Sequence, residues 1–162
     1  MNKLILMTGT PGSGKSFLVS QLEKDLGTAN WLDILSTDNL WETPNGQYLW
    51  HPDGLYHAHK LNQIKTKVAM GLGIEVLIID NTNLTYKECM PYCYLAVENG
   101  YSVEIWEPKT EWANNPEECF KRNTHGVPLE AIERMLARKE PVDTMIEKLQ
   151  TLITGLQITK GN

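Results

Sequence analysis

The sequence predicts an α/β fold in which a parallel sheet of about four strands is flanked by helices. Short apolar runs alternate along the chain with longer segments of helical composition, which is the pattern of repeated β-α units. The first apolar run, at 3–8, contains no polar alternation, as expected of a strand that is buried on both faces. A glycine-rich turn follows this run directly and leads into a segment of helical composition.

The other elements follow in order along the chain. The run at 75–80 is the clearest strand, and Gly100 is a typical stop for the helix that precedes the last strand. Asn115 can cap a helix that has Pro116 at its first position. The other predicted strands are 31–36 and 101–106, the other predicted helices are 15–26, 55–71, 85–99, 128–139 and 142–153, residues 37–53 are predicted to be loop, and the final residues are predicted to be frayed.

Length, composition and charge restrict the class of protein. The chain has 162 residues, of which 41% are hydrophobic, so we expect one globular domain over 1–162. Its three cysteines show no metal-type clustering, and no apolar run suits a membrane span or a signal peptide, so we expect a cytoplasmic protein that does not bind membranes. The net charge of −5 excludes a non-specific nucleic-acid coat but allows a small basic site for one strand end.

The glycine-rich turn carries the complete signature Gly-x4-Gly-Lys-Ser of a phosphate-binding loop. Its glycines let backbone N–H groups close around phosphate oxygens, and the following helix adds the positive end of its dipole. We expect Lys15 to reach the β- and γ-phosphates of ATP and Ser16 to bind Mg²⁺. A chance glycine-rich turn is the alternative, which the flanking strand and helix disfavour. The predicted nucleotide-binding residues of this loop are Gly9, Thr10, Pro11, Gly12, Ser13, Gly14, Lys15 and Ser16.

A carboxylate after the second predicted strand favours a small kinase among the proteins that use such a loop. The chain is too short for a motor ATPase, and it lacks the Asn-Lys-x-Asp segment with which GTPases read their base. Asp38 is expected at the carboxyl edge of the sheet, where it can accept the proton of an acceptor hydroxyl. An Asx turn or a helix cap is equally compatible with this position.

Polar residues also follow the third predicted strand. Asp80 stands where a P-loop enzyme carries a second carboxylate that organises Mg²⁺. Thr82 and Asn83 offer short polar groups at the same edge of the sheet, for the acceptor. Ordinary turn chemistry is the alternative for these residues.

Two predicted helices surround a glycine-containing break and together suit a lid at about 115–138. An arginine in such a lid can neutralise charge on the transferred phosphoryl group, and Arg122 is the first candidate and Arg134 the second. His125, within the break, can touch phosphate or simply cap the break. We expect Arg138 to be solvated surface.

These segments together resemble the polynucleotide 5′-hydroxyl kinase family, over most of the chain up to about Glu140. Four segments are similar to the phosphate loop, the general-base segment, the Asp-Thr-Asn-Leu motif and the lid of the T-even phage enzyme. These segments are 9–16, Ser36-Thr37-Asp38, Asp80-Asn81-Thr82-Asn83-Leu84 and Lys121-Arg122-Asn123. A closer likeness is to kinase-like domains of eukaryotic ubiquitin-ligase-binding proteins, which share Ile-Ile-Asp-Asn-Thr-Asn, Gly-Tyr-x-Val-Glu and Arg-Asn-x-His-Gly-Val.

The resemblance implies an enzyme that transfers the γ-phosphate of Mg·ATP to the 5′-hydroxyl of DNA or RNA. Asp38 would deprotonate that hydroxyl. Nucleotide contacts are implied for Lys15, Ser16 and Arg122, and contacts with the acceptor strand are implied for Thr82 and Asn83. The resemblance leaves both Asp80 and Asn81 as candidates for the acidic position of the third motif.

The chain departs from the phage enzyme at Trp41. The phage enzyme has an arginine there, three residues beyond its general base, whereas a tryptophan can stack on an unpaired base. Trp41 belongs to an aromatic-rich loop that either stacks on the acceptor or forms a small core of its own. The other aromatic residues of this loop are Tyr48, Trp50 and Tyr56. No length remains for the phosphatase domain of the phage enzyme.

Two other functions remain open. A small-molecule kinase would use the same loop and base, and a basic rim at Lys109, Lys121 and Arg122 would instead favour a nucleic-acid strand. A nucleotide-dependent binding module without turnover would fit a chain that lacks the general base, but Asp38 is present. No feature of the sequence indicates an obligate protein partner.

Overall fold

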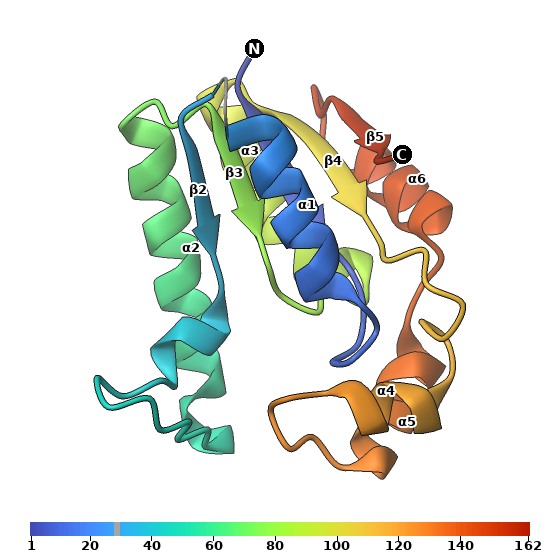
Figure 1. Ribbon diagram of the computed structural model, residues 1–162. Coiled ribbons are helices and arrows are strands. Elements are labelled where there is room, and N and C mark those ends of the chain that lie inside the picture. The colour runs from blue at the N-terminus through green and yellow to red at the C-terminus, as the bar shows by residue number, and fades with distance from the viewer. Residues whose placement is uncertain (28–29) are drawn as a thin grey trace.

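A parallel sheet forms the centre of the computed structural model, which describes residues 1–27 and 30–162 (Figure 1). Within these residues the sheet has five strands in the order β2-β3-β1-β4-β5, and every neighbouring pair is parallel. The strands are β1 (Lys3–Met7), β2 (Leu32–Leu35), β3 (Val76–Ile79), β4 (Ser102–Trp106) and β5 (Ile158–Lys160). The α/β fold class with a parallel sheet is therefore confirmed.

The central strand, β1, explains why the sheet has helices on both faces. Leu4 and Leu6 of β1 belong to a core cluster on one face, whereas Ile5 and Met7 belong to a second cluster on the other. All four side chains are fully buried. The sequence of this strand is a continuous apolar run, because helices cover both of its faces.

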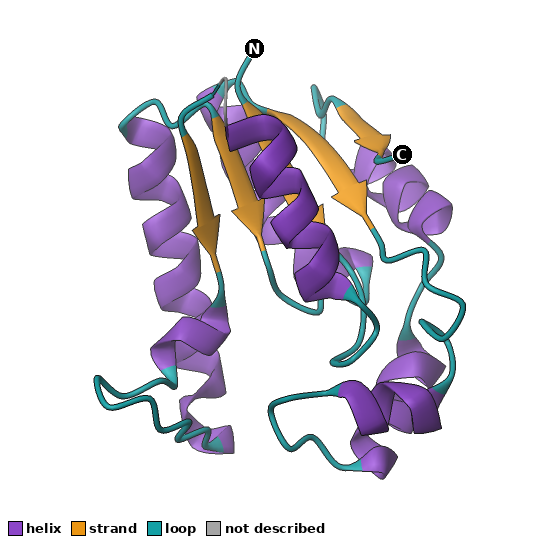
Figure 2. Ribbon diagram, in the orientation of Figure 1, coloured by secondary structure: helices purple, strands orange, loops and turns teal. Residues whose placement is uncertain are grey.

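Helices form a layer on each face of the sheet (Figure 2). Helix α1 packs on one face through Val19 and Leu22, and the larger core cluster on the other face contains residues of α2, α3 and α6. Helices α4 and α5 lie beyond the carboxyl ends of the strands, near the bottom of Figure 1. The helices are α1 (Lys15–Gly27), α2 (Leu55–Gly71), α3 (Tyr86–Asn99), α4 (Pro116–Arg122), α5 (Leu129–Arg138) and α6 (Val142–Leu152).

The predicted end signals of the helices agree with the structure. Asn115 caps α4 through its side chain, which accepts a hydrogen bond from the backbone N–H of Glu118, and Pro116 is the first helical residue. Gly100 ends α3 in the left-handed conformation, with a φ of 73°. Each predicted strand and helix occurs within a residue or two of its expected bounds.

The fifth strand, β5, is the main difference from the sequence-based expectation. Residues 158–160 were expected to be frayed, but they pair with β4 at the edge of the sheet. Only Ile158 of β5 is buried, so this strand lacks the apolar run that identifies the central ones. The backbone of Gly161, just after β5, packs against the ring of Trp106, where a β-carbon would collide.

The segment between β2 and α2 contains more structure than the predicted loop. It includes two short 3-10 helices, η1 (Thr37–Leu40) and η2 (Pro52–Gly54). Between them, Glu42 and Tyr48 form an antiparallel bridge. Of the helices in the described residues, none is long and apolar enough to cross a membrane.

Candidate active site

A large cavity lies at the carboxyl ends of the strands, where parallel sheets bind ligands. Its volume is about 840 Å³, which is within the usual range for ligand sites. Its walls come from the glycine-rich loop, the ends of β2 and β3, the segment before α2, and the α4–α5 region. The predicted site residues that line it are Thr10, Pro11, Gly12, Gly14, Lys15, Ser16, Asp38, Trp41, Asp80, Thr82, Arg122 and His125.

The glycine-rich loop accepts hydrogen bonds from side chains of the segment that follows β4. Gly12 and Gly14 have φ angles of 79° and 101°, which glycine adopts without strain. The indole N–H of Trp112 donates to the carbonyl of Gly12 at 3.1 Å, and the hydroxyl of Thr110 donates to that of Ser13 at 2.7 Å. A β-carbon on Gly12 would collide with the carbonyl of Cys119 in α4.

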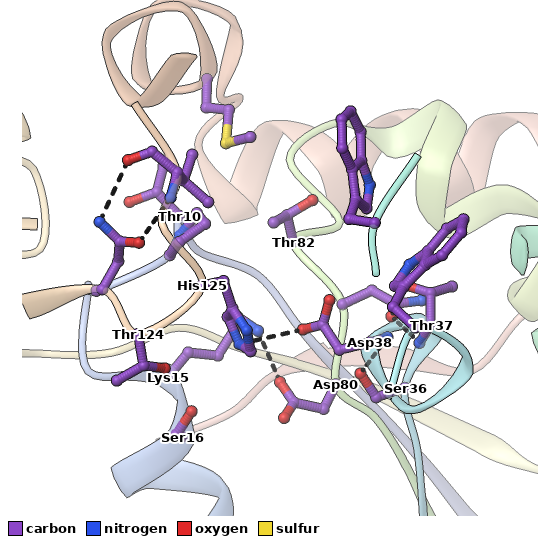
Figure 3. A pocket seen from close by; sticks show the side chains of 18 of the residues that line it. Thr10, Lys15, Ser16, Ser36, Thr37, Asp38, Asp80, Thr82, Thr124 and His125 are labelled. Atoms are coloured by element: carbon purple, nitrogen blue, oxygen red, sulfur yellow. Dashed lines mark hydrogen bonds and ion pairs between the residues drawn. The ribbon is translucent and has the colours of Figure 1, made fainter. Parts of the chain in front are cut away.

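Lys15 and Asp80 form an ion pair in the wall of the cavity (Figure 3). The Nζ of Lys15 lies 2.7 Å from the Oδ1 of Asp80, and the two side chains are only 12% and 20% exposed. The ammonium group therefore lies beside a carboxylate, and Ser16 follows Lys15 at the start of α1. This set of groups has the chemistry that a phosphate chain and a divalent cation require.

Asp38 faces the cavity from η1. The cap of η1 is Ser36, whose Oγ accepts a hydrogen bond from the backbone N–H of Asp38 at 3.1 Å, so the Asp38 carboxylate is not the cap. Its Oδ1 accepts a hydrogen bond from the hydroxyl of Tyr48 at 3.1 Å. Its Oδ2 lies 3.6 Å from the Nε2 of His125, which comes from the opposite wall (Figure 3).

Asn81 fixes η1 relative to the end of β3. Its Oδ1 accepts hydrogen bonds from both the backbone N–H and the hydroxyl of Thr37, each at 3.0 Å. Its Nδ2 lies 3.4 Å from the hydroxyl of Tyr92, which in turn accepts a hydrogen bond from Asn62. Between the two candidates for the acidic position, Asp80 is the one whose side chain contacts Lys15, whereas Asn81 supports the segment that carries Asp38.

The α4 helix brings Arg122 to the cavity. Its guanidinium group lies 3.7 Å from the centre of the Trp112 ring, and its Nε lies 3.6 Å from a carboxylate oxygen of Glu118. The next turn is shaped by Asn123, whose Oδ1 accepts a hydrogen bond from the N–H of Val127 at 2.9 Å. This closed turn carries His125 toward Asp38.

Four predicted site residues do not line the cavity. The Nδ2 of Asn83 donates to the buried carbonyl of Met7 at 2.8 Å, so this amide joins β1 to the chain after β3. The backbone N–H of Gly9 is similarly bonded to the carbonyl of Thr82, and the side chain of Ser13 is buried beside Gly9. Arg134 is exposed on α5 and is absent from the cavity wall.

Arg138 takes the place in the cavity wall that was expected for Arg134. Ala131, Met135 and Arg138 line the cavity, and their spacing of four and three residues places them on one face of α5. Arg138 also pairs with Glu88 of α3 at 3.0 Å. Helical spacing could have identified this face from the sequence, but the orientation of α5 could not be predicted.

Further residues of the wall were not assigned to the site from the sequence. Trp112 gave no sequence signal, because its contact with the phosphate loop spans 100 residues. Lysines 109 and 121 do not line the cavity, so Arg122 is the one member of the expected basic rim that does. Tyr48 was expected to stack or to form a small core, and its hydrogen bond to Asp38 was not anticipated.

Burial perturbs two titratable groups of the wall. Burial, followed by the charge of Asp38, raises the pKa of Tyr48 well above its usual value, so Tyr48 is a stable hydrogen-bond donor at neutral pH. Burial also lowers the pKa of His59 on α2, an effect that the nearby Glu88 opposes in part. His59 is therefore favoured in its neutral form within the folded chain.

A phosphate loop, its lysine and the Asp38 carboxylate, all facing one cavity, define a P-loop kinase-like domain. In the described residues, no group of three or more His, Cys, Asp and Glu side chains could hold a metal ion by itself. A divalent cation would fit here through Ser16 and Asp80 together with nucleotide phosphates, as Mg²⁺ commonly binds in such enzymes.

Comparisons with known proteins agree with this class. The sequence profile of a family described as AAA domain (AAA_33) matches residues 4–142, and the chain belongs to this family. The human NEDD4-binding protein 2 is 44% identical over 133 residues, which are 82% of this chain and 7% of that much longer protein. The predicted resemblance to polynucleotide kinase-like P-loop domains is thereby confirmed.

Solved structures share the fold at low sequence identity. The structure of the Pnkp1/Rnl/Hen1 RNA repair complex contains a chain with a TM-score of 0.66 and 20% identity, over 91% of this chain and 46% of that one. A putative kinase from Chloroflexus aurantiacus has a TM-score of 0.63 and 16% identity, over 99% and 84% of the two chains.

Proposed function

We propose that this chain is a polynucleotide 5′-hydroxyl kinase that transfers the γ-phosphate of ATP to the 5′ end of DNA or RNA. The observation that carries this proposal is that Asp38 faces the same cavity as Lys15 and Ser16. A general base and a phosphate-binding lysine in one cavity are the parts that transfer to a hydroxyl requires.

The nucleotide is assigned to the glycine-rich loop and to Arg122. Lys15 turns from Asp80 to contact the β- and γ-phosphates, and loop N–H groups surround their oxygens. Ser16 and Asp80 would hold Mg²⁺, which would neutralise charge on the phosphates. Arg122 leaves the Trp112 ring and approaches the transferred phosphoryl group, for which its half-exposed position gives it freedom.

The acceptor is assigned to the opposite wall. Trp41 and Trp50 line this wall edge to face, with ring centres 6.5 Å apart, and offer apolar surfaces to an unpaired base. Thr82 and His125 line the same cavity, and the Nε2 of His125 lies 3.6 Å from Asp38, so both can contact the acceptor end. The RNA repair complex among the structural neighbours makes a broken strand end a reasonable acceptor.

We also propose that residues 1–162 work as one kinase domain in which 115–138 act as a lid. Gly126, with a φ of 66°, lies in the turn between α4 and α5, and the pair of helices covers one side of the cavity. The three buried free cysteines support a reducing compartment such as the cytoplasm. The proposed partner is the nucleic-acid substrate, with no membrane and no obligate protein partner.

A transfer assay tests this function. The chain is incubated with Mg²⁺, γ-labelled ATP and short DNA or RNA oligonucleotides that carry a 5′-hydroxyl, and we expect label at the 5′ end. Asp38→Asn is expected to keep ATP binding and to lose transfer by about 10²-fold or more. Asp33→Asn, an exposed carboxylate on the same β2 strand, is the matched control.

A small-molecule kinase is the second candidate. It is favoured by the absence of Lys109 and Lys121 from the cavity wall, which leaves little positive charge for a long strand. Free nucleosides and nucleotides in the same assay decide between the two. Label on these acceptors but on no oligonucleotide would contradict the polynucleotide assignment, and binding of Mg·ATP without any transfer would instead support a binding module.

A further inference from the structure

The two oxygens of the Asp38 carboxylate have different surroundings. Oδ1 accepts a hydrogen bond from the Tyr48 hydroxyl at 3.1 Å, and this tyrosine lies on the same wall as Asp38. Oδ2 faces His125 at 3.6 Å, across the cavity and on the α4–α5 side. The first contact is a hydrogen bond within one segment, whereas the second is a longer contact between two segments that can separate.

A short hairpin brings Tyr48 back to Asp38. The backbone N–H of Thr43 donates to the carbonyl of Gln47 at 2.8 Å, and that of Leu49 donates to the carbonyl of Trp41 at 2.8 Å. Together with the bridge between Glu42 and Tyr48, these bonds set the register of the two arms. Tyr48 is thereby fixed ten residues after the carboxylate that it contacts.

The hairpin is in turn anchored at its base. The ring of Trp41 lies against Gly54, where a β-carbon would come within 2.8 Å of the ring. Trp41 also contacts Trp50 edge to face. The Tyr48 ring also packs against His125 with centres 5.0 Å apart, so the same residue of the α4–α5 turn contacts both Tyr48 and Asp38.

We propose that Tyr48 is the positioning residue of the general base: it occupies Oδ1 of Asp38 and so directs Oδ2 toward the acceptor hydroxyl. This inference rests on the proposed kinase function. The acceptor hydroxyl takes the place beside Oδ2 that His125 holds here, and His125 moves aside with the lid. Tyr48 does not touch the reacting atoms, and it acts only through Asp38.

During transfer, one bond to the γ-phosphorus forms and one breaks. The acceptor oxygen forms a bond to the γ-phosphorus of ATP, and its proton passes to Oδ2 of Asp38. The bond between the γ-phosphorus and the bridging oxygen of ADP breaks, and ADP leaves with that electron pair. Tyr48 keeps its proton throughout, because burial and the charge of Asp38 both disfavour its ionised form.

Tyr48→Phe tests this role, since it removes the hydroxyl and keeps the ring. We expect kcat for transfer to an oligonucleotide to fall about tenfold or more, while KM for ATP and for the acceptor change less than about twofold. Tyr56→Phe is the matched control, because Tyr56 lies in the same region of the chain but is two-thirds exposed and outside the cavity wall. Thermal unfolding verifies that each variant is folded.

A double-mutant comparison separates this role from a structural one. In an Asp38→Asn background, Tyr48→Phe should leave the residual rate unchanged, because a positioning residue has nothing left to position. An unchanged kcat for Tyr48→Phe, or a rise in acceptor KM alone, would overturn the positioning role but not the kinase. Lack of transfer by the unmodified chain would overturn the proposed function and this role with it.

Discussion

Buried polar side chains join the polar residues at the ends of β2 and β3 into one rigid unit. The Asn81 amide binds both polar groups of Thr37, and Asn83 binds the carbonyl of Met7. A buried amide without these partners would cost free energy, because it has lost its contacts with water. Each of these side chains therefore has one favoured orientation. The Asp38 carboxylate thus projects from a segment whose adjacent residue, Thr37, is bonded to Asn81 just after β3.

The first prediction at this scale concerns Asn83. Asn83→Ala should destabilise the chain by about 1–3 kcal/mol, because it leaves the buried carbonyl of Met7 without its donor. The φ of 39° at this position adds to the cost, since alanine disfavours it more than asparagine. Urea unfolding measures the change. Loss of acceptor binding with unchanged stability would instead support the predicted acceptor role of Asn83.

The second prediction concerns His59, whose pKa is lowered mainly by burial. Below pH 6.5, the ordinary value, the unfolded chain binds more protons at this position than the folded chain does, so stability falls as the pH falls. His59→Gln should make the decline in urea midpoint below pH 6.5 shallower. His57→Gln, an exposed histidine on the same helix, is the control, and equal slopes for the two variants would contradict the prediction.

At the scale of elements, short segments far apart in sequence complete the sheet and the cavity. Strand β5 pairs with the outer edge of β4, and the backbone of Gly161 packs against the Trp106 ring. The segment that follows β4 reaches the phosphate loop through Thr110 and Trp112. Since these contacts join distant parts of the chain, they depend on the assembled sheet rather than on local preference.

The prediction at this scale concerns β5. Ile158 is 5% exposed and belongs to the larger core cluster, so Ile158→Ala should cost about 2–5 kcal/mol of unfolding free energy. Thr159→Ala, at the exposed next position of the strand, should change it by less than about 0.5 kcal/mol. Urea unfolding of both variants provides the comparison. Equal values would mean that β5 contributes little to the core.

At the scale of the whole molecule, the cavity lies between two sides that are built from different parts of the chain. One side is formed by the segment between β2 and α2, and the opposite side by α4, α5 and the turn between them. The two sides meet where His125 contacts Asp38 and Tyr48. Ligands that occupy this space are therefore expected to stabilise the molecule as a unit.

The prediction at this scale concerns Mg·ATP. At a free concentration of one hundred times its Kd, Mg·ATP should raise the unfolding free energy by about 2.7 kcal/mol. Lys15→Ala should abolish this gain at the same concentration, whereas Lys24→Ala, exposed on the same helix, should keep it. Thermal unfolding with and without nucleotide measures the effect. A full gain in Lys15→Ala would place the nucleotide elsewhere.

The sequence by itself determined the features that depend on local patterns. The apolar runs of β1 and β3, the caps of α3 and α4, and the phosphate-loop signature each act over a few neighbouring residues. Hydrophobic periodicity and helix-end residues are therefore sufficient to predict the fold class, whereas the family was predicted from the resemblance of the motifs.

Only the tertiary structure decided which polar groups meet. Three hydrogen bonds join residues that no local pattern relates. They run from Tyr48 to Asp38, from Trp112 to Gly12 and from Asn83 to Met7. The same holds for Arg138 in place of Arg134, which depends on how α5 is rotated. Such contacts follow from the packing of whole elements, because a side chain's partners are chosen only when its helix or strand is oriented against the rest.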